Sequence, residues 1–213
     1  MTFRTLNVTA LIDGPVPRCQ NRAMTVEVAP IDRQDAILDA AFGVFAAYGY
    51  RWTTIEDIAR AAGLSRTAIY LHFRSKEDIL RNLTLRYFDE CLAAMAVALN
   101  APGQDAETAL YNGFVAKDGK YMEVVLSTPH GAELLDASLA ISADLVRSAD
   151  ERTAQTLCPW LEARGLPDAL APAKSLAETI VAALMGLKSN SKTLAELRSG
   201  EAQLARLVAR ALA

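Results

Sequence analysis

The stretch AAGLSRTAIYLHF, residues 61–73, decides the fold, because apolar residues at helical spacing run through it on both sides of a glycine. Gly63 would cost about 1 kcal/mol inside a continuous helix. Ser65 follows it, and serine is a preferred N-cap because its hydroxyl accepts hydrogen bonds from the free N–H groups of a helix start. The stretch therefore predicts a tight turn between two short helices, with Gly63 supplying a backbone conformation that side chains resist.

The helix after this turn has two predicted faces. Its inward positions are Leu64, Ala68, Ile69 and Phe73, and its outward positions are Arg66, Thr67, Tyr70 and Leu71. A helix, a glycine turn and a second helix together are the signature of the helix-turn-helix motif. In that motif the second helix lies in the major groove of DNA, so the outward residues are expected to contact base edges and phosphates.

Further helices are predicted around the motif. The first begins at Arg33 and stops at Gly49, with apolar residues at three- and four-residue steps. The second is capped by Thr53 or Thr54 and ends at the glycine turn. A long fourth helix opens at Lys76, with apolar residues recurring every four positions. Residues 1–32 show no sustained period and contain three prolines, which predicts a flexible arm and makes Met24 an alternative start to Met1.

The net charge of −3 hides a basic segment. Residues 48–76 carry five basic and two acidic side chains, a net of +3, whereas residues 77–213 carry 13 basic and 18 acidic ones. Attraction to phosphate depends on charges within about a Debye length, roughly 10 Å. A cationic segment on an acidic body is therefore compatible with DNA binding, although the charge alone fits an ordinary solvated surface equally well.

The run TTIEDIARAAGLSRTAIYLHFRSKEDIL, residues 53–80, resembles the DNA-binding domain of the TetR family of bacterial transcriptional regulators. The shared features are the paired threonines, the AAG turn, the Ser-Arg opening, the Tyr-x-x-Phe spacing and the Ser-Lys-Glu. The resemblance implies a DNA-binding domain at 33–80 and an all-helical ligand-binding and dimerisation domain at 81–213. It also implies a cytoplasmic repressor that binds a palindromic double-stranded DNA operator as a homodimer and is released by a small-molecule effector.

Carried over to this sequence, the family's DNA contacts fall on Thr54, Ser65, Arg66, Thr67, Tyr70, Leu71, His72 and Lys76. Thr54 at its helix N-terminus would bind a phosphate, Arg66 is the candidate for a bidentate contact to guanine, and Lys76 would pair a phosphate. Many family members have Gly and Thr where this chain has Thr67 and Ala68, which leaves open which side chain reads DNA. Packing roles for Tyr70 and His72, and a solvated Lys76, are the alternatives.

The remainder of the chain is predicted to be helical. Breaks are expected at 100–105, 127–131 and 165–172, with helices at 105–127, 131–164, 173–190 and 193–212 and an interruption of the second of these at Pro159. The last two helices have small-residue and leucine-rich faces that are too apolar for water. The resemblance implies that these two helices pair with their counterparts in a second subunit.

The resemblance also implies an effector pocket between the fourth helix and the middle helices. The residues available there are Tyr87, Phe88, Met95, Tyr111, Phe114, Tyr121, Met122 and Trp160. Such an inventory favours a hydrophobic or aromatic effector. The alternative is that these residues are ordinary core. His130 is expected to be a loop or helix-start residue rather than a ligand.

Other functions are disfavoured by what the sequence lacks. It has two histidines and neither a GxSxG nor an HExxH motif, so no enzyme is predicted. The segment GLKSNSKT, 186–193, imitates a P-loop but has Ser191 where the second glycine belongs. Three widely spaced cysteines predict neither a metal site nor a disulfide and fit a reducing cytoplasm. No cofactor and no membrane span is expected, since every apolar run is shorter than about 20 residues. A helical adaptor that binds protein is the alternative function.

Overall fold

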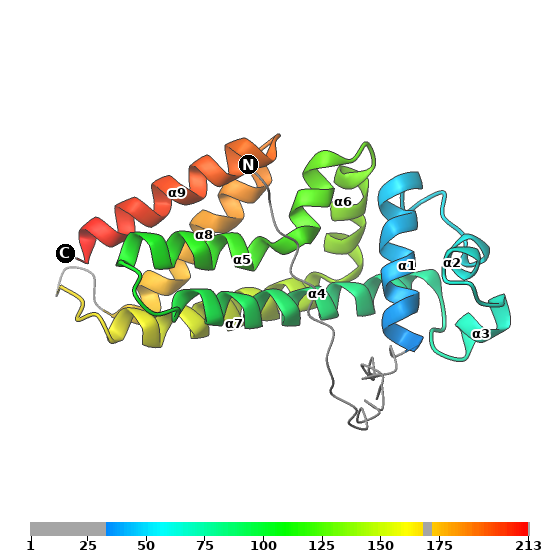
Figure 1. Cartoon of the computed structure of the whole chain (residues 1–213), viewed down its shortest axis with the longest axis horizontal. Coiled ribbons are helices and arrows are strands. Elements are labelled where there is room, and N and C mark those ends of the chain that lie inside the picture. Colours follow the sequence, from blue (N-terminus) through cyan, green and yellow to red (C-terminus); the bar gives the residue numbers. More distant parts are fainter. Residues whose placement is uncertain (1–32, 168–171, 213) are drawn as a thin grey trace, which may run out of the picture. The chain divides into compact units, whose positions relative to one another are not determined.

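The computed structural model describes residues 33–167 and 172–212 (Figure 1). All regular structure in these residues is helical, which confirms the predicted all-α fold. The helices are α1 (Arg33–Tyr48), α2 (Ile55–Ala61), α3 (Arg66–Tyr70), α4 (Lys76–Leu99), α5 (Ala106–Ser127), α6 (Gly131–Ile141), α7 (Ala143–Glu162), α8 (Ala173–Asn190) and α9 (Leu194–Ala211). Residues 32–213 form one compact unit. The expectations about the N-terminal arm and the start at Met1 or Met24 lie outside the described residues.

Local signals set the ends of the first helices. α1 stops at Gly49, whose φ of +84° suits glycine and whose N–H donates to the Phe45 carbonyl at 2.9 Å. α4 begins after Ser75, whose hydroxyl accepts a hydrogen bond from the Asp78 N–H at 3.2 Å. These caps satisfy backbone groups that helix ends leave free, so the predicted starts and stops of the N-terminal helices agree with the structure.

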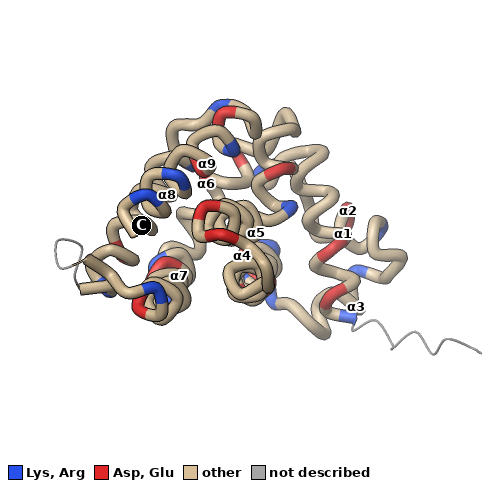
Figure 2. Tube along the Cα trace, turned by 60° about the vertical axis from the view of Figure 1, so that its left-hand side comes forward, with Lys and Arg blue, Asp and Glu red and all other residues tan. Residues whose placement is uncertain are grey.

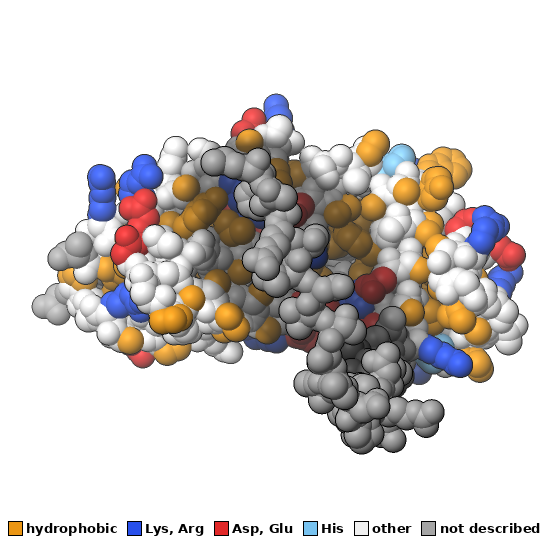
Figure 3. All heavy atoms as spheres, viewed as in Figure 1, with side chains coloured by type: hydrophobic (Ala, Val, Ile, Leu, Met, Phe, Trp, Pro, Cys, Tyr) orange, Lys and Arg blue, Asp and Glu red, His pale blue; other side chains and the backbone are white. Residues whose placement is uncertain are grey.

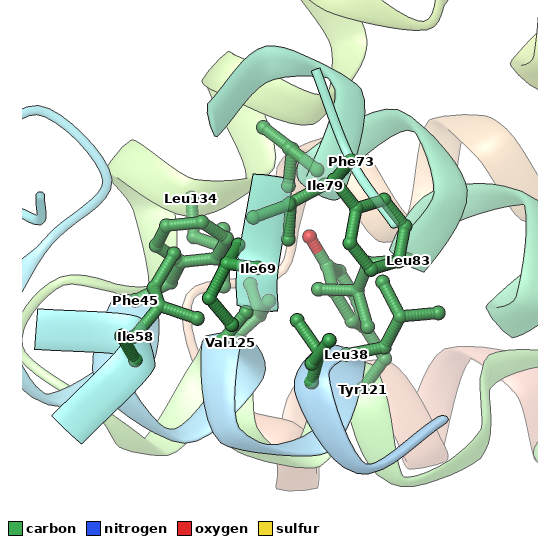
Figure 4. Packing of buried hydrophobic residues seen from close by; sticks show 14 of the residues in the cluster. Leu38, Phe45, Ile58, Ile69, Phe73, Ile79, Leu83, Tyr121, Val125 and Leu134 are labelled. Atoms are coloured by element: carbon green, nitrogen blue, oxygen red, sulfur yellow. The ribbon is translucent and has the colours of Figure 1, made fainter. Parts of the chain in front are cut away.

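The first hydrophobic core joins the N-terminal helices to the body. Figure 4 shows Phe45 of α1, Ile58 of α2 and Ile69 of α3 lying together with Val125 of α5 and Leu134 of α6. All five side chains are buried. The cluster therefore crosses residue 80, where the sequence suggests a domain boundary, and it holds α1–α3 against α5 and α6.

A second hydrophobic core fills the other part of the body. It contains buried side chains of α4, α5, α7, α8 and α9, among them Met95, Phe114 and Trp160. The Trp160 indole N–H donates a 2.8 Å hydrogen bond to the carbonyl of Leu99, at the C-terminal end of α4. This bond satisfies the single polar atom of a large buried ring, as aromatic core residues usually require.

α5 contains a kink that the sequence pattern does not predict. Gly119 has φ +51° and ψ −168°, outside the helical region. A Cβ at this position would lie 2.7 Å from the Cys91 sulfur, so the approach of α4 also requires glycine. The Tyr87 hydroxyl donates to the Asp118 carbonyl at 2.8 Å, which gives a partner to a backbone oxygen next to the kink.

The break between α6 and α7 lies elsewhere than expected. The sequence predicts an interruption at Pro159, yet Pro159 lies inside α7, where the buried neighbours Leu157 and Trp160 hold the helix in place. The chain breaks instead at Ser142, with φ −128° and ψ 31°. Arg81 of α4 stabilises this break, because its guanidinium donates to the Ile141 carbonyl at 3.4 Å and to the Asp144 carboxylate at 2.7 Å.

Candidate DNA-binding surface and effector cavity

The N-terminus of α2 is closed by a capping box. The Thr54 hydroxyl accepts a hydrogen bond from the Asp57 N–H at 3.2 Å, and the Asp57 carboxylate accepts one from the Thr54 N–H at 3.0 Å. The hydrogen bonds from Thr54 lower the pKa of Asp57. Of the two predicted caps, Thr54 is the one used, while Thr53 is buried and donates its hydroxyl to the Gly49 carbonyl at 2.7 Å.

The turn into α3 has the predicted chemistry. Gly63 has φ +66°, a left-handed conformation that other residues adopt only with strain. The Ser65 hydroxyl then accepts a 3.1 Å hydrogen bond from the Ala68 N–H, which caps α3. Ile69 is fully buried and Phe73 nearly so, and these two side chains anchor the inner face of the short helix in the first core.

The outer face of α3 is open to solvent. Arg66, Thr67, Tyr70 and Leu71 are all exposed, Leu71 by 79% and Tyr70 by 45%. An Arg66 guanidinium nitrogen donates to the Tyr70 hydroxyl at 3.3 Å, and the guanidinium lies 5.5 Å from the ring centroid. The ring thus orders the arginine without consuming most of its donors, which leaves a planar cation available for a base edge or phosphate.

Charge and apolar surface are mixed around this face. Figure 2 shows basic and acidic positions interspersed along α1–α3. On the face in Figure 3, apolar side chains reach the surface at the α1–α3 end, at the right of the view. Two aromatics that sequence reasoning missed contribute to this exposed apolar surface: Tyr48 is 67% and Trp52 is 76% exposed. The signal available in the sequence was an aromatic residue at the end of α1 and a second one within the short loop that leads to α2.

His72 and Lys76 differ from the other predicted contact residues. His72 is half-buried just beyond α3. The Lys76 ammonium turns inward and donates to the carbonyl oxygens of Tyr50 at 2.8 Å, Thr53 at 2.9 Å and Arg51 at 3.2 Å. It also lies 4.5 Å from the Tyr50 ring centroid. The ammonium thus ties the loop before α2 to the start of α4, and its predicted contact with a phosphate stays a prediction.

A cavity of about 110 Å³ lies between α4, α5, α6, α7 and α8. Four of the predicted pocket residues, Tyr87, Phe88, Tyr121 and Met122, line it. The ring centroids of Tyr87 and Tyr121 are 4.6 Å apart, and the Tyr121 hydroxyl shares a 2.8 Å hydrogen bond with the Ser138 hydroxyl. The other four predicted residues do not reach this cavity: Met95, Tyr111, Phe114 and Trp160 belong to the second core or pack against it.

The cavity wall also carries charges that sequence reasoning missed. Lys117, Asp150 and Lys188 line it. The Lys188 ammonium lies 2.7 Å from the carboxylate of Asp118, a buried residue at the α5 kink. Burial and the nearby Lys188 charge lower the pKa of Lys117 to about 8. These residues are brought together by the packing of α5, α7 and α8, so no local spacing in the sequence indicates them.

No site for a metal ion is present in the part of the chain that the structure describes, since no group of three His, Cys, Asp or Glu side chains gathers there. Within residues 33–167 and 172–212, each helix is too short or too polar to serve as a membrane span. His130 precedes α6, with its imidazole 3.8 Å from the Glu133 carboxylate, and the Arg51 N–H donates to Glu133 at 2.7 Å.

Comparison with known proteins agrees with the helix-turn-helix geometry. The family model described as bacterial regulatory proteins, tetR family, matches residues 37–83. The transcriptional repressor ComR of Escherichia coli is 27% identical over 173 residues, which cover 77% of this chain and 81% of ComR. The repressor KstR2 of Mycolicibacterium smegmatis is 29% identical over 110 residues, about half of each protein. These relatives are transcriptional regulators and indicate no enzyme family.

Solved structures share the fold over most of the chain. A transcriptional regulator from Rhodococcus sp. Rha1 has a TM-score of 0.63 at 19% identity and covers 83% of this chain and 96% of its own. A TetR transcriptional regulator from Legionella pneumophila has a TM-score of 0.60 at 18% identity and covers 82% and 96%. Together with the capped α2, the glycine turn and the open face of α3, the match at residues 37–83 supports a tetR-family DNA-binding segment, and the solved structures show that the fold of these regulators extends over most of the chain.

Proposed function

We propose that the protein is a repressor that binds a palindromic operator as a homodimer and leaves it when a small effector binds. The open face of α3 is the observation that carries this proposal. Arg66, Thr67, Tyr70 and Leu71 project from a helix whose inner face is fixed by Ile69, so the outer side chains are held ready for the major groove. Binding to the bacterial chromosome would place the protein in the cytoplasm.

The two C-terminal helices support the proposed homodimer. Leu207 of α9 is 68% exposed. A shallow groove between these helices is lined by apolar side chains that include Leu187, Leu204 and Leu207. A second copy of the same face would cover them. A twofold axis there would give two α3 helices the spacing of about 34 Å that successive major grooves require.

α4 supports the proposed link between effector and DNA. Its first turn holds the loop before α2 through Lys76, and its middle contributes Thr84, Tyr87 and Phe88 to the cavity. An effector that fits one position of α4 better than another would therefore shift α3 relative to the α3 helix of the second subunit. Couplings of this kind amount to about 1–3 kcal/mol.

The test is selection of genomic fragments by the purified protein, followed by sequencing. We expect enrichment of a palindrome by the wild type and loss of that enrichment in Arg66→Ala and Tyr70→Ala. Arg147→Ala, which removes an exposed arginine of α7, is the matched control and should retain it. Affinity for the selected site should fall steeply with salt, because phosphate contacts release counterions.

A different result would favour the adaptor. If the wild type enriches no sequence at low salt, and a protein partner is retained regardless of salt, the repressor proposal fails. Equal enrichment by the wild type and both α3 variants would show that the open face of α3 does not read DNA.

A further inference from the structure

The ammonium of Lys117 is a cation without a partner beside the cavity. Within residues 33–167 and 172–212 no carboxylate lies within 4 Å of it, and it makes no hydrogen bond. Its neighbour Lys188 is paired with Asp118 at 2.7 Å. Lys117 is half-buried, and holding an ammonium partly out of water without a counter-ion is costly, so a group that supplied a negative charge here would be bound favourably.

The charges around Lys117 favour an anion rather than a cation. Lys188 is the single charge with the largest influence on Lys117, and it is repulsive; Asp118 and Asp150 attract Lys117, each less strongly than Lys188 repels it. The Asp118 carboxylate already forms an ion pair with Lys188. Asp150 also lines the separate open groove between α7 and α8, where solvent reaches it. An anion between the two lysines would therefore relieve their repulsion, whereas a second cation would increase it.

The size of the cavity limits the apolar part of the occupant. Its volume is about 110 Å³. A protein cavity of about 150 Å³ holds one benzene molecule, so this smaller space limits the apolar body to about one ring at most. The aromatic side chains of Tyr87, Phe88 and Tyr121, with Met122, would surround such a body.

We propose that the effector is a small organic carboxylate whose apolar body, about one ring in size, packs among Tyr87, Phe88 and Met122 while its carboxylate binds the Lys117 ammonium. This assignment deepens the proposed function, on which its regulatory meaning rests. The binding itself can be measured without DNA, so the two proposals fail separately.

The first experiment compares three probes of one ring that differ in charge: benzoate, benzyl alcohol and benzylamine. Calorimetric titration of the full chain should give the tightest binding for benzoate and the weakest for benzylamine. In Lys117→Met we expect benzoate affinity to fall at least tenfold while that for benzyl alcohol is retained. This variant should fold, because it replaces an unpaired, half-buried cation with an apolar side chain of similar length.

Lys120→Met is the matched control, since it removes an exposed lysine of the same helix that does not line the cavity. It should bind benzoate as the wild type does. The proposal is overturned if Lys117→Met binds benzoate unchanged, if benzylamine binds better than benzoate, or if benzoate does not bind at all. Benzoate binding that leaves operator affinity unchanged would instead overturn the effector mechanism and keep the binding site.

Discussion

Ser65 fixes the start of α3 through both of its oxygens. Its hydroxyl accepts a hydrogen bond from the Ala68 N–H at 3.1 Å, and its carbonyl accepts one from the Ile69 N–H at 3.2 Å. α3 is only five residues long, so little of its stability can come from its own backbone. The cap and the buried Ile69 together hold the DNA-reading face in place.

Ser65→Ala should lower the free energy of unfolding by about 1 kcal/mol, the usual cost of a lost N-cap. Because α3 would fray, operator affinity should fall as well, although no DNA contact of Arg66 has been removed. Urea denaturation of the variant beside the wild type measures the first effect. Ser148→Ala, which changes an exposed serine in the interior of α7, should move the unfolding free energy by less than about 0.5 kcal/mol. Equal losses in the two variants would contradict the capping argument.

The roles of single residues could be predicted from the sequence where they interact with atoms only a few residues away. Ser65 and Thr54 act on atoms three residues away, so a pattern of hydroxyl and helix start identifies them. Lys76 bonds to carbonyls 23 to 26 residues away, and Lys117 matters only because α8 brings Lys188 to it. No periodicity contains such information.

The contact between α5 and α9 contains a buried charged cluster. Arg198 of α9 lies 2.8 Å from the Glu201 carboxylate, and one Glu201 oxygen has no hydrogen-bond partner. Burial and the charge of nearby Asp118 raise the pKa of Glu201 to about 7, although Arg198 opposes this change. We therefore expect the protonation of this carboxyl to affect the stability of the packing of α9 on α5.

Glu201→Gln should remove a pH dependence of stability. The carboxyl binds its proton more tightly in the folded chain, with a pKa of about 7, than in the unfolded chain, with a pKa of 4.5. The wild type should therefore lose stability as the pH rises from about 4.5 to about 7. Denaturation midpoints across this window should fall less in Glu201→Gln. Glu151→Gln, an exposed carboxyl of α7, should follow the wild type. Parallel curves for the wild type and Glu201→Gln would contradict the assignment.

The ends of helices could be predicted from the sequence where a capping residue marks them. They could not be predicted where contacts with another helix cause the break. The ends of α1 and α4 follow from Gly49 and Ser75. The kink at Gly119 depends on Tyr87 and Cys91 of α4, and the break at Ser142 is stabilised by Arg81. A glycine within an apolar helical pattern does not by itself say which of these roles it has.

At the scale of the molecule, the hydrophobic pattern identified inward faces but not their partners. Tyr121 and Val125 of α5 belong to the same core as Ile58 and Ile69 of the helix-turn-helix. The eight aromatic and methionine residues expected at one pocket are divided between the cavity and the second core for the same reason. Which helices meet is decided by packing over separations of 50 residues or more.

The proposed homodimer gives a prediction at this scale. Leu207→Arg should convert the dimer to a monomer and weaken operator binding, because it places a charge in the apolar groove between α8 and α9. Sedimentation velocity measures the change in mass. Val97→Arg, at a 73% exposed position of α4, should remain dimeric. A Leu207→Arg protein that sediments as the wild type does would place the interface on another face.

The inward turn of Lys76 has a consequence for chimeric regulators. A graft that transferred only residues 33–75 to another body would carry the loop of residues 50–53 but not the ammonium that binds three of its carbonyl oxygens. Ile79, Leu80 and Leu83 of α4 are also buried in the core of this segment. A graft therefore has to extend at least two turns into α4, to Leu83, because a junction placed at the helix start would separate the loop from the lysine that holds it.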